Sequence, residues 1–246
     1  MVENAGRPPR LRHGARAFEI NPYTRWVYDH PGRLLPEPSP QALARLRGAD
    51  AARRPLRVEL GSGSGRFLVQ QAARHPQVHF VGFELRFKRL VQSARKAEQL
   101  GLDNVWFLRE QGEHLFRYFG AGTLEGLIVN FPDPWPKAAQ WRKRLINTPF
   151  LARLYEALRP GGWFQLKTDH SGYFLHVLAL IRSPSPWTLR GFSNDLHRGG
   201  AVAGDVRSEF EQLFASIHKP IFHLLLEKPG GPARECAPDA RGDAAR

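Results

Sequence analysis

Apolar residues recur through the middle of the chain in two patterns that alternate. Short runs dominated by apolar residues predict β-strands, and these runs cover residues 56–60, 78–85, 104–108, 125–131, 163–168 and 220–228. Segments with apolar residues three or four positions apart predict α-helices, and they cover residues 66–75, 86–101, 150–159, 173–181 and 208–217. Strands that alternate with helices predict an α/β fold built on a mostly parallel, doubly wound sheet.

The two ends of the chain lack these patterns. Residues 1–54 are rich in Arg and Pro, and helical spacing occurs only in the segment PQALARLRG. We therefore expect a basic N-terminal arm with one short helix over residues 1–54, followed by one domain over residues 55–228. Residues 183–207 are expected to be irregular. Residues 229–246 have the composition of a disordered tail.

Composition and charge bear on the partner more than on the fold. The chain has 246 residues and a net charge of +13, which favours a polyanionic partner, nucleic acid before an anionic membrane. Most of the basic residues are Arg, which genome composition could explain, but exchanging Lys for Arg leaves the net charge unchanged. A hydrophobic content of 42% excludes wholesale disorder. The single cysteine, Cys236, excludes an internal disulfide, and no apolar run reaches the length of a membrane span, so we expect a cytoplasmic protein.

A glycine-rich segment, VELGSGSGRF, joins the first predicted strand to the helix after it. Gly61, Gly63 and Gly65 would let the backbone approach a ligand and would present the N–H groups of the helix start to it. Their spacing differs from the dinucleotide fingerprint G-x-G-x-x-G, because Arg66 stands where that fingerprint needs glycine. The spacing fits S-adenosylmethionine better than NAD, although the loop alone could be an ordinary turn.

Polar side chains lie at the ends of three neighbouring predicted strands. Glu59 precedes the glycines and could face the ammonium group of the cofactor, while Glu84 ends the second strand, where an acid accepts from both ribose hydroxyls. Gln111 follows the third strand and could bond adenine or be a surface residue, since an amide both donates and accepts. Together with the glycines, these side chains predict a nucleotide-type site.

The segment NFPDPWPK follows the fourth predicted strand. Each of its three prolines removes an N–H donor and fixes φ, so the segment must be a stiff loop. The loop would place Asp133 at the carboxyl edge of the sheet, beside the reactive end of the cofactor. Trp135 could stack on a base or anchor the loop, and the basic residues 142–144 could hold phosphates.

Taken in order, these motifs resemble those of the bacterial tRNA (guanine-N7-)-methyltransferases. The resemblance runs from Leu56 to Lys228 and rests on VELGSGSGRF, VGFEL, NFPDPWPK, RPGGWFQLKTDHSGYF, NDLH and SEFEQLFASIHKPIF. It implies the Rossmann-like fold of methyltransferases that use S-adenosylmethionine. It also implies methyl transfer to N7 of a guanine in the variable loop of tRNA, with no metal.

The resemblance implies a role for each matching residue. The residues that would bind the cofactor are Glu59, Gly61, Gly63, Gly65, Glu84, Gln111 and Asp133. Asp133 would also be the active-site residue. The residues that would bind tRNA are Lys137, Arg142, Lys143, Arg144, Asp169, Ser208, Glu209, Phe210 and Glu211.

Three positions depart from the family pattern. Gln111 replaces an Asp, but a neutral amide can still bond adenine. Ala139 and Gln140 replace an Arg-His pair, so two groups that would face RNA are missing. The adjacent Trp141 could stack on a base or pack on the surface. These departures concern the affinity or identity of the substrate more than the chemistry.

The chemistry of guanine N7 limits what the site must do. N7 carries a lone pair and no proton, so attack on a sulfonium methyl group needs alignment and no general base. We expect Asp133 to accept hydrogen bonds from the N1–H and N2 edge of the base and to stabilise its developing positive charge.

Two other functions compete with this interpretation. The Asp-Pro-Trp sequence also resembles the motif of amino methylases, so another nucleobase methyltransferase acting on RNA or DNA is possible. A non-catalytic RNA-binding paralogue is the second alternative. The sequence leaves the oligomeric state open between a monomer and a homodimer.

Overall fold

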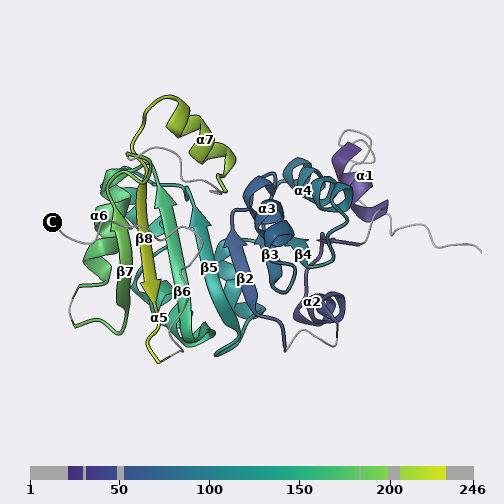
Figure 1. Cartoon of the computed structure of the whole chain (residues 1–246), viewed down its shortest axis with the longest axis horizontal. Coiled ribbons are helices and arrows are strands. Elements are labelled where there is room, and N and C mark those ends of the chain that lie inside the picture. Colours follow the sequence, from purple (N-terminus) through teal and green to yellow (C-terminus); the bar gives the residue numbers. More distant parts are fainter. Residues whose placement is uncertain (1–21, 30–31, 49–52, 183, 199–205, 231–246) are drawn as a thin grey trace, which may run out of the picture.

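The computed structural model describes residues 22–29, 32–48, 53–182, 184–198 and 206–230, which form one eight-stranded sheet with helices on both faces (Figure 1). The sheet order is β1-β4-β3-β2-β5-β6-β8-β7. The strands are β1 (Leu34–Leu35), β2 (Leu56–Leu60), β3 (His79–Phe83), β4 (Val105–Leu108), β5 (Leu124–Asn130), β6 (Leu158–Thr168), β7 (Thr188–Ser193) and β8 (Phe222–Glu227). Pairing is parallel from β1 to β6, and β8 is antiparallel to both β6 and β7.

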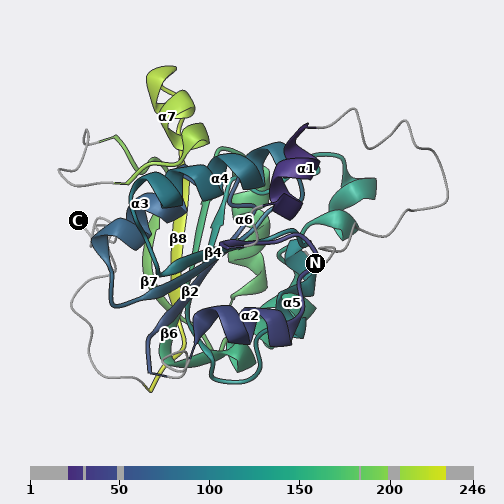
Figure 2. The same ribbon diagram turned by 90° about the vertical axis from the view of Figure 1, so that its right-hand side faces the viewer.

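The helices lie in two layers on opposite faces of the sheet, which Figure 2 shows from the side. Each layer packs on its own hydrophobic core. One core contains side chains of α1 (Pro22–Asp29), α3 (Arg66–Arg74) and α4 (Phe87–Gln99). The other contains side chains of α2 (Pro40–Arg47), the 3-10 helix η2 (Gly112–Arg117), α5 (Thr148–Ala157) and α6 (Ser171–Leu180). Because helices cover both faces, the central strands are buried on both sides, which explains their continuous apolar runs.

The predicted α/β fold and the six predicted strands are confirmed. The helix predicted over 150–159 begins at Thr148, two residues earlier. Its N-cap is Asn147, whose side chain accepts a hydrogen bond from the Phe150 N–H. It ends at Ala157, and residues 158–162 belong to β6. Strand β7 falls inside the segment expected to be irregular; it is an edge strand with no buried residue and so lacks an apolar run.

The described residues between 22 and 48 contain α1 and β1 in addition to α2, the one short helix that was expected. Val27 of α1 and Leu34 of β1 are buried in the core that contains α3 and α4, so this region packs on the domain. Strand β1 has two residues, too few to produce a recognisable pattern. Residues 1–21 of the predicted arm and residues 231–246 of the predicted tail lie outside the described residues. None of the described helices is long and apolar enough to cross a membrane.

The order of the strands determines where a ligand can bind. The chain adds β3 and β4 on one side of β2, and then β5 and β6 on the other side. Open α/β sheets bind ligands outside the carboxyl ends of the strands at such a reversal point, here between β2 and β5. Helix α7 (Glu209–Ser216) stands above this edge of the sheet in Figure 1.

Candidate active site

A cavity of about 480 Å³ opens at the reversal point, within the usual range for small-molecule sites. It is lined by the ends of β2, β3 and β5, the segments that follow β2, β3, β4 and β5, and the start of α7. Predicted site residues that line it are Glu59, Gly61, Gly63, Glu84, Gln111, Asp133, Lys143, Ser208, Glu209 and Phe210. Those outside its lining are Gly65, Lys137, Arg142, Arg144, Asp169 and Glu211.

The glycine loop has the backbone conformation that its composition suggests. Gly61, Gly63 and Gly65 have φ values of 73°, 57° and 74°, a region that residues with a side chain rarely adopt. A Cβ on Gly65 would lie 2.6 Å from the Ser93 Oγ, so α4 also excludes a side chain there. The Gly63 N–H donates to Glu84 Oε2 at 3.1 Å, which joins the loop to the end of β3.

Glu59 is an almost fully buried acid at the floor of the cavity. The Asn130 Nδ2 donates to its Oε1 at 2.9 Å, whereas no hydrogen-bond partner for its Oε2 exists among the described residues. Burial raises the pKa of Glu59 to about 8, although the bond from Asn130 and the charge of Lys167 act in the opposite direction. An unsatisfied carboxylate oxygen in a cavity wall fits a cationic ligand group.

The proline loop is held in a strained conformation by buried contacts. Phe131 and Trp135 have positive φ values of 53° and 42°, which cost of the order of 1–3 kcal/mol each and require support. The Arg144 Nε donates to the Pro134 carbonyl at 2.9 Å, and its guanidinium lies between the rings of Trp141 and Tyr173. The loop thereby presents Asp133, which is exposed, to the cavity.

The comparisons with known proteins agree with this site. Residues 53–224 match a family model described as "Putative methyltransferase". The tRNA (guanine-N(7)-)-methyltransferase of Levilactobacillus brevis is 33% identical over 208 residues, which cover 83% of this chain and 94% of that protein. The enzyme of the same name from Geobacillus kaustophilus is 32% identical over 83% of this chain and 94% of its own length. The chain belongs to the tRNA (guanine-N7-)-methyltransferase family.

Solved structures of other methyltransferases have the same fold as this chain. The 16S rRNA methyltransferase KamB aligns with a TM-score of 0.56 at 16% identity, covering 80% of this chain and 99% of KamB. An antibiotic-related methyltransferase aligns with a TM-score of 0.55, also at 16% identity, covering 80% of this chain and 96% of that chain. At this identity the likeness concerns the fold, a Rossmann-like methyltransferase sheet.

S-adenosylmethionine, the cofactor of this methyltransferase fold, fits the residues of the cavity. The free Oε2 of Glu59 suits the ammonium group of its methionine part, and the Glu84 carboxylate at the end of β3 suits the ribose hydroxyls. Gln111 is exposed on the cavity wall, whereas the neighbouring Glu110 accepts from the Tyr118 hydroxyl and the Gln111 N–H. Gln111 is therefore the more available of the two for adenine.

Two residues assigned to tRNA in this methyltransferase occupy the interior. Arg144 is 2% exposed and donates to the Pro134 carbonyl of the proline loop, whereas Arg142 and Lys143 are exposed. Glu211 is fully buried and accepts from Lys167 Nζ at 3.0 Å, which makes it an internal anchor of α7. Both side chains therefore make internal contacts in this structure, and their assignment to tRNA stays a prediction. Asp169 forms an ion pair with Lys219, and Lys143 Nζ lies 4.6 Å from the Trp135 ring centre.

Three contributors to the site were not predicted from the sequence. Asn130 donates a hydrogen bond to Glu59, and it could have been found as the polar residue that ends an apolar strand. Ser64 and Arg89 contact Glu209 and bring α7 to the glycine loop. No local signal marks this contact, since Ser64 and Glu209 are 145 positions apart.

The pKa of Glu59 leads to a prediction about cofactor affinity. Because the acid is largely protonated below pH 8 and an ammonium ligand favours its ionised form, binding releases a proton. We expect the affinity for S-adenosylmethionine to rise up to about tenfold per pH unit between roughly pH 6 and pH 8. Calorimetry in two buffers of different ionisation enthalpy measures both the affinity and the proton release.

The variant Glu59→Gln provides the control, because it keeps the shape and cannot ionise. Its affinity should be lower at pH 8 and almost independent of pH, and a variant that keeps the wild-type slope would contradict the assignment. The free protein should show the opposite trend in stability. Its folded state binds the proton of Glu59 up to about pH 8 and its unfolded state only to about 4.5, so stability falls between these values.

Proposed function

We propose that this protein transfers the methyl group of S-adenosylmethionine to N7 of a guanine in tRNA, in the variable loop. The observation that carries the proposal is the position of Asp133: a strained loop, fixed by a buried arginine, presents this acid to the same cavity as Glu59 and Glu84. The names of the relatives support the choice of tRNA and of guanine N7.

The arrangement suits a displacement that needs no proton transfer. When bound, S-adenosylmethionine supplies an electrophilic methyl group on a sulfonium. The chain itself must hold the guanine so that N7 faces that group, because alignment of the reacting atoms can supply a large part of the rate enhancement. We assign this task to Asp133, whose carboxylate would accept from the N1–H and N2 edge of guanine. Adenine has no N1–H and would be rejected.

Basic side chains lie around the cavity. Arg66, Arg86 and Arg89 line it beside the glycine loop and Glu84, Lys143 lines it beside the proline loop, and Lys137 and Arg142 are exposed on the adjoining segment. Lys137, Arg142 and Lys143 would hold phosphates of the RNA backbone, which provides affinity without sequence information. A base inside a folded tRNA must also leave its stack to reach the cavity, at a cost of a few kcal/mol.

The decisive experiment is incubation with unmodified tRNA transcripts and methyl-labelled S-adenosylmethionine. Digestion and mass spectrometry should find 7-methylguanosine, and sequencing should place it in the variable loop. Another methylated nucleoside would instead support the alternative of a different nucleobase methyltransferase. Absence of cofactor binding in calorimetry would support a non-catalytic RNA-binding protein.

The contrast between Arg142 and Arg144 gives a further prediction. Arg142→Ala should weaken tRNA binding and lower the slope of log Kd against log salt concentration by about one, because one phosphate contact is lost. Arg144→Ala should instead lower the melting temperature, because a buried hydrogen bond to the Pro134 carbonyl is lost.

Filter binding at several salt concentrations and thermal melts separate these outcomes. Arg74→Ala, an exposed arginine at the far end of α3 and outside the cavity, controls for the change in net charge. If Arg142→Ala behaved like Arg74→Ala, the basic segment would not contact the RNA backbone.

A further inference from the structure

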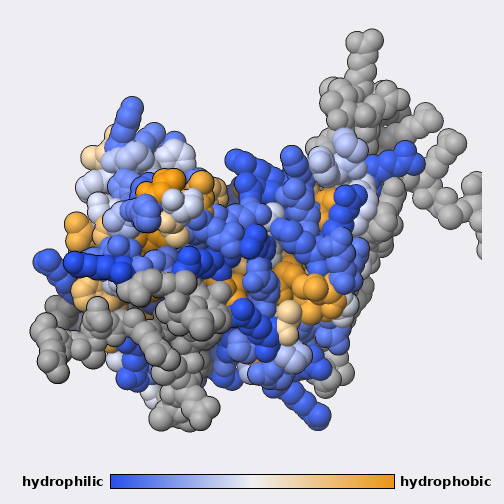
Figure 3. Space-filling view, turned by 45° about the horizontal axis from the view of Figure 1, so that its top comes forward, coloured by the Kyte–Doolittle hydropathy of each residue, from blue (hydrophilic) through white to orange (hydrophobic). Residues whose placement is uncertain are grey.

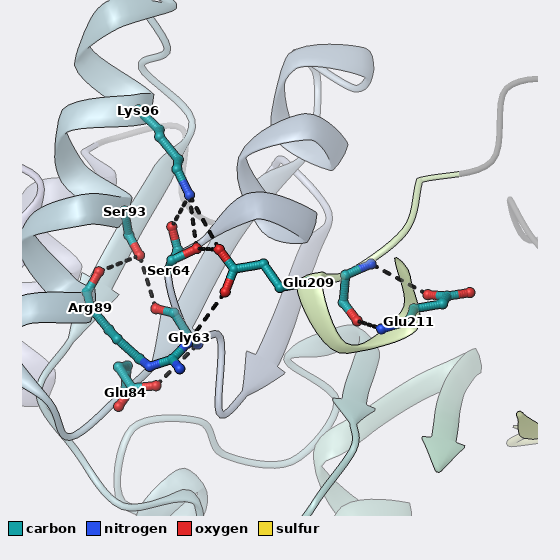
Figure 4. Close-up of polar contacts among 9 residues, drawn as sticks. Gly63, Ser64, Glu84, Arg89, Ser93, Lys96, Glu209 and Glu211 are labelled. Carbon is teal, nitrogen blue, oxygen red and sulfur yellow. Dashed lines mark hydrogen bonds and ion pairs between the residues drawn. The ribbon is translucent and has the colours of Figure 1, made fainter. Parts of the chain in front are cut away.

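Helix α7 reaches the glycine loop through one acid. The Ser64 hydroxyl donates to Glu209 Oε1, and two cations of α4 approach the same carboxylate (Figure 4). Arg89 Nη1 lies 3.4 Å from Glu209 Oε2, and Lys96 Nζ lies 3.8 Å from Oε1. Glu209 was expected to bind tRNA, but its contacts in the structure are with the part of the chain that would hold the cofactor.

Side chains of α4 also hold the glycine loop itself. Lys96 Nζ donates to the Ser64 carbonyl at 2.9 Å, and the Ser93 hydroxyl donates to the Gly63 carbonyl at 3.2 Å. The Gly63 N–H in turn donates to Glu84, a residue of the proposed ribose site. The position of Glu209 is therefore tied by hydrogen bonds to the conformation of the loop that approaches the cofactor.

The same helix contacts the proline loop with its aromatic side chains. The ring centres of Phe210 and Phe214 lie 6.2 Å and 5.3 Å from that of Phe131, two residues before Asp133. Phe210 lines the cavity and is 46% exposed. In Figure 3, where the carboxyl edge turns toward the viewer, an apolar patch lies in the region of α7. Helix α7 thus bridges the cofactor side and the substrate side.

The two attachments of α7 differ in their environment. The Glu211 side chain is 0% exposed and paired with Lys167, so this anchor is shielded from water. The Glu209 side chain is 45% exposed, and those of Arg89 and Lys96 are 30% and 38% exposed. Ion pairs at that exposure are weak enough to form and break in the folded state.

We propose that Glu209 is a positioning residue that couples cofactor binding at the glycine loop to the placement of α7 beside the proline loop. A cofactor that orders the glycine loop favours the docked position of α7, and the docked helix completes the wall on which tRNA binds. Cofactor and tRNA then bind cooperatively, and the coupling is reciprocal. The tRNA part of this inference rests on the proposed function, whereas the docking of α7 does not.

The test compares wild type with Glu209→Ala, with the graded variant Glu209→Gln and with the control Glu98→Ala. Glu98 is an exposed acid of α4 outside the cavity lining, so its removal changes the net charge equally. Gln can still accept from the Ser64 hydroxyl, so Glu209→Gln should retain part of the effect. Thermal melts check that each variant is folded.

Hydrogen exchange with mass spectrometry follows the amides of α7 with and without S-adenosylhomocysteine. Wild type and Glu98→Ala should gain protection in α7 on binding, and Glu209→Ala should gain none. In filter binding, S-adenosylhomocysteine should tighten tRNA binding by roughly fivefold or more in wild type and leave it unchanged in Glu209→Ala.

Equal protection of α7 in wild type and Glu209→Ala would overturn the proposal, as would unchanged coupling in the variant. Lack of tRNA methylation by the wild type would refute the proposed function alone, because the exchange experiment needs only S-adenosylhomocysteine. The two failures are therefore distinguishable.

Discussion

Asp133→Ala should lower kcat/KM for methyl transfer to tRNA by roughly 100-fold to 1,000-fold, the usual effect of removing one preorganised electrostatic group. The carboxylate lines the cavity and is exposed, so the substitution removes the proposed contact to the guanine and no part of the core. Stability should stay close to wild type, and the affinity for S-adenosylhomocysteine measures how far Asp133 also binds the cofactor, as the family resemblance implies. Initial rates with labelled cofactor, a thermal melt and calorimetry measure the three quantities.

Two further variants make the result specific. Asp133→Asn keeps the shape and one acceptor but loses the charge, so an intermediate rate would separate charge from hydrogen bonding. Asp103→Ala removes an exposed acid at the opposite, amino end of β4 and controls for net charge. Near-normal turnover of a folded Asp133→Ala would refute the assigned role.

The cavity could be predicted from sequence because its parts follow short-range rules. Apolar runs that alternate with helical segments determine a parallel sheet, and in such a sheet the residues after each strand meet at one edge. Glu59, Glu84 and Asp133 each follow or end a strand, so their convergence in one cavity was predictable. The burial of Glu59 and its raised pKa depend on packing around it and were not predictable.

The roles of neighbouring basic residues could not be predicted in the same way. Arg142, Lys143 and Arg144 are consecutive and chemically alike, yet only Arg144 is buried. The difference arises because the 3-10 helix η3 (Ala138–Lys143) ends just before Arg144. The Arg144 side chain then packs against the proline loop and donates to the Pro134 carbonyl. The pairing of Glu211 with Lys167 likewise joins α7 to β6, residues 44 positions apart, and no local pattern predicts it.

The pair between Lys167 and Glu211 should be the most costly single contact to break. Both side chains are 0% exposed, with Lys167 Nζ 3.0 Å and 3.2 Å from the two carboxylate oxygens. Glu211→Gln keeps the shape but removes the negative charge that is paired with the buried ammonium. We expect a loss of about 3–5 kcal/mol in the free energy of unfolding, the range for a buried pair with one partner removed. Urea denaturation of wild type and variant measures it.

A surface pair in the same sheet supplies the comparison. Arg190 Nη2 lies 2.7 Å from Glu227 Oε1, but the Arg190 side chain is 54% exposed. Arg190→Ala should therefore cost only about 0–1 kcal/mol. Replacing both buried partners, as Lys167→Met with Glu211→Leu, should recover part of the stability, because the variant buries neither charge of this pair. If Glu211→Gln lost activity with tRNA at unchanged stability, Glu211 would act on the substrate, and its assignment as a buried anchor of α7 would be wrong.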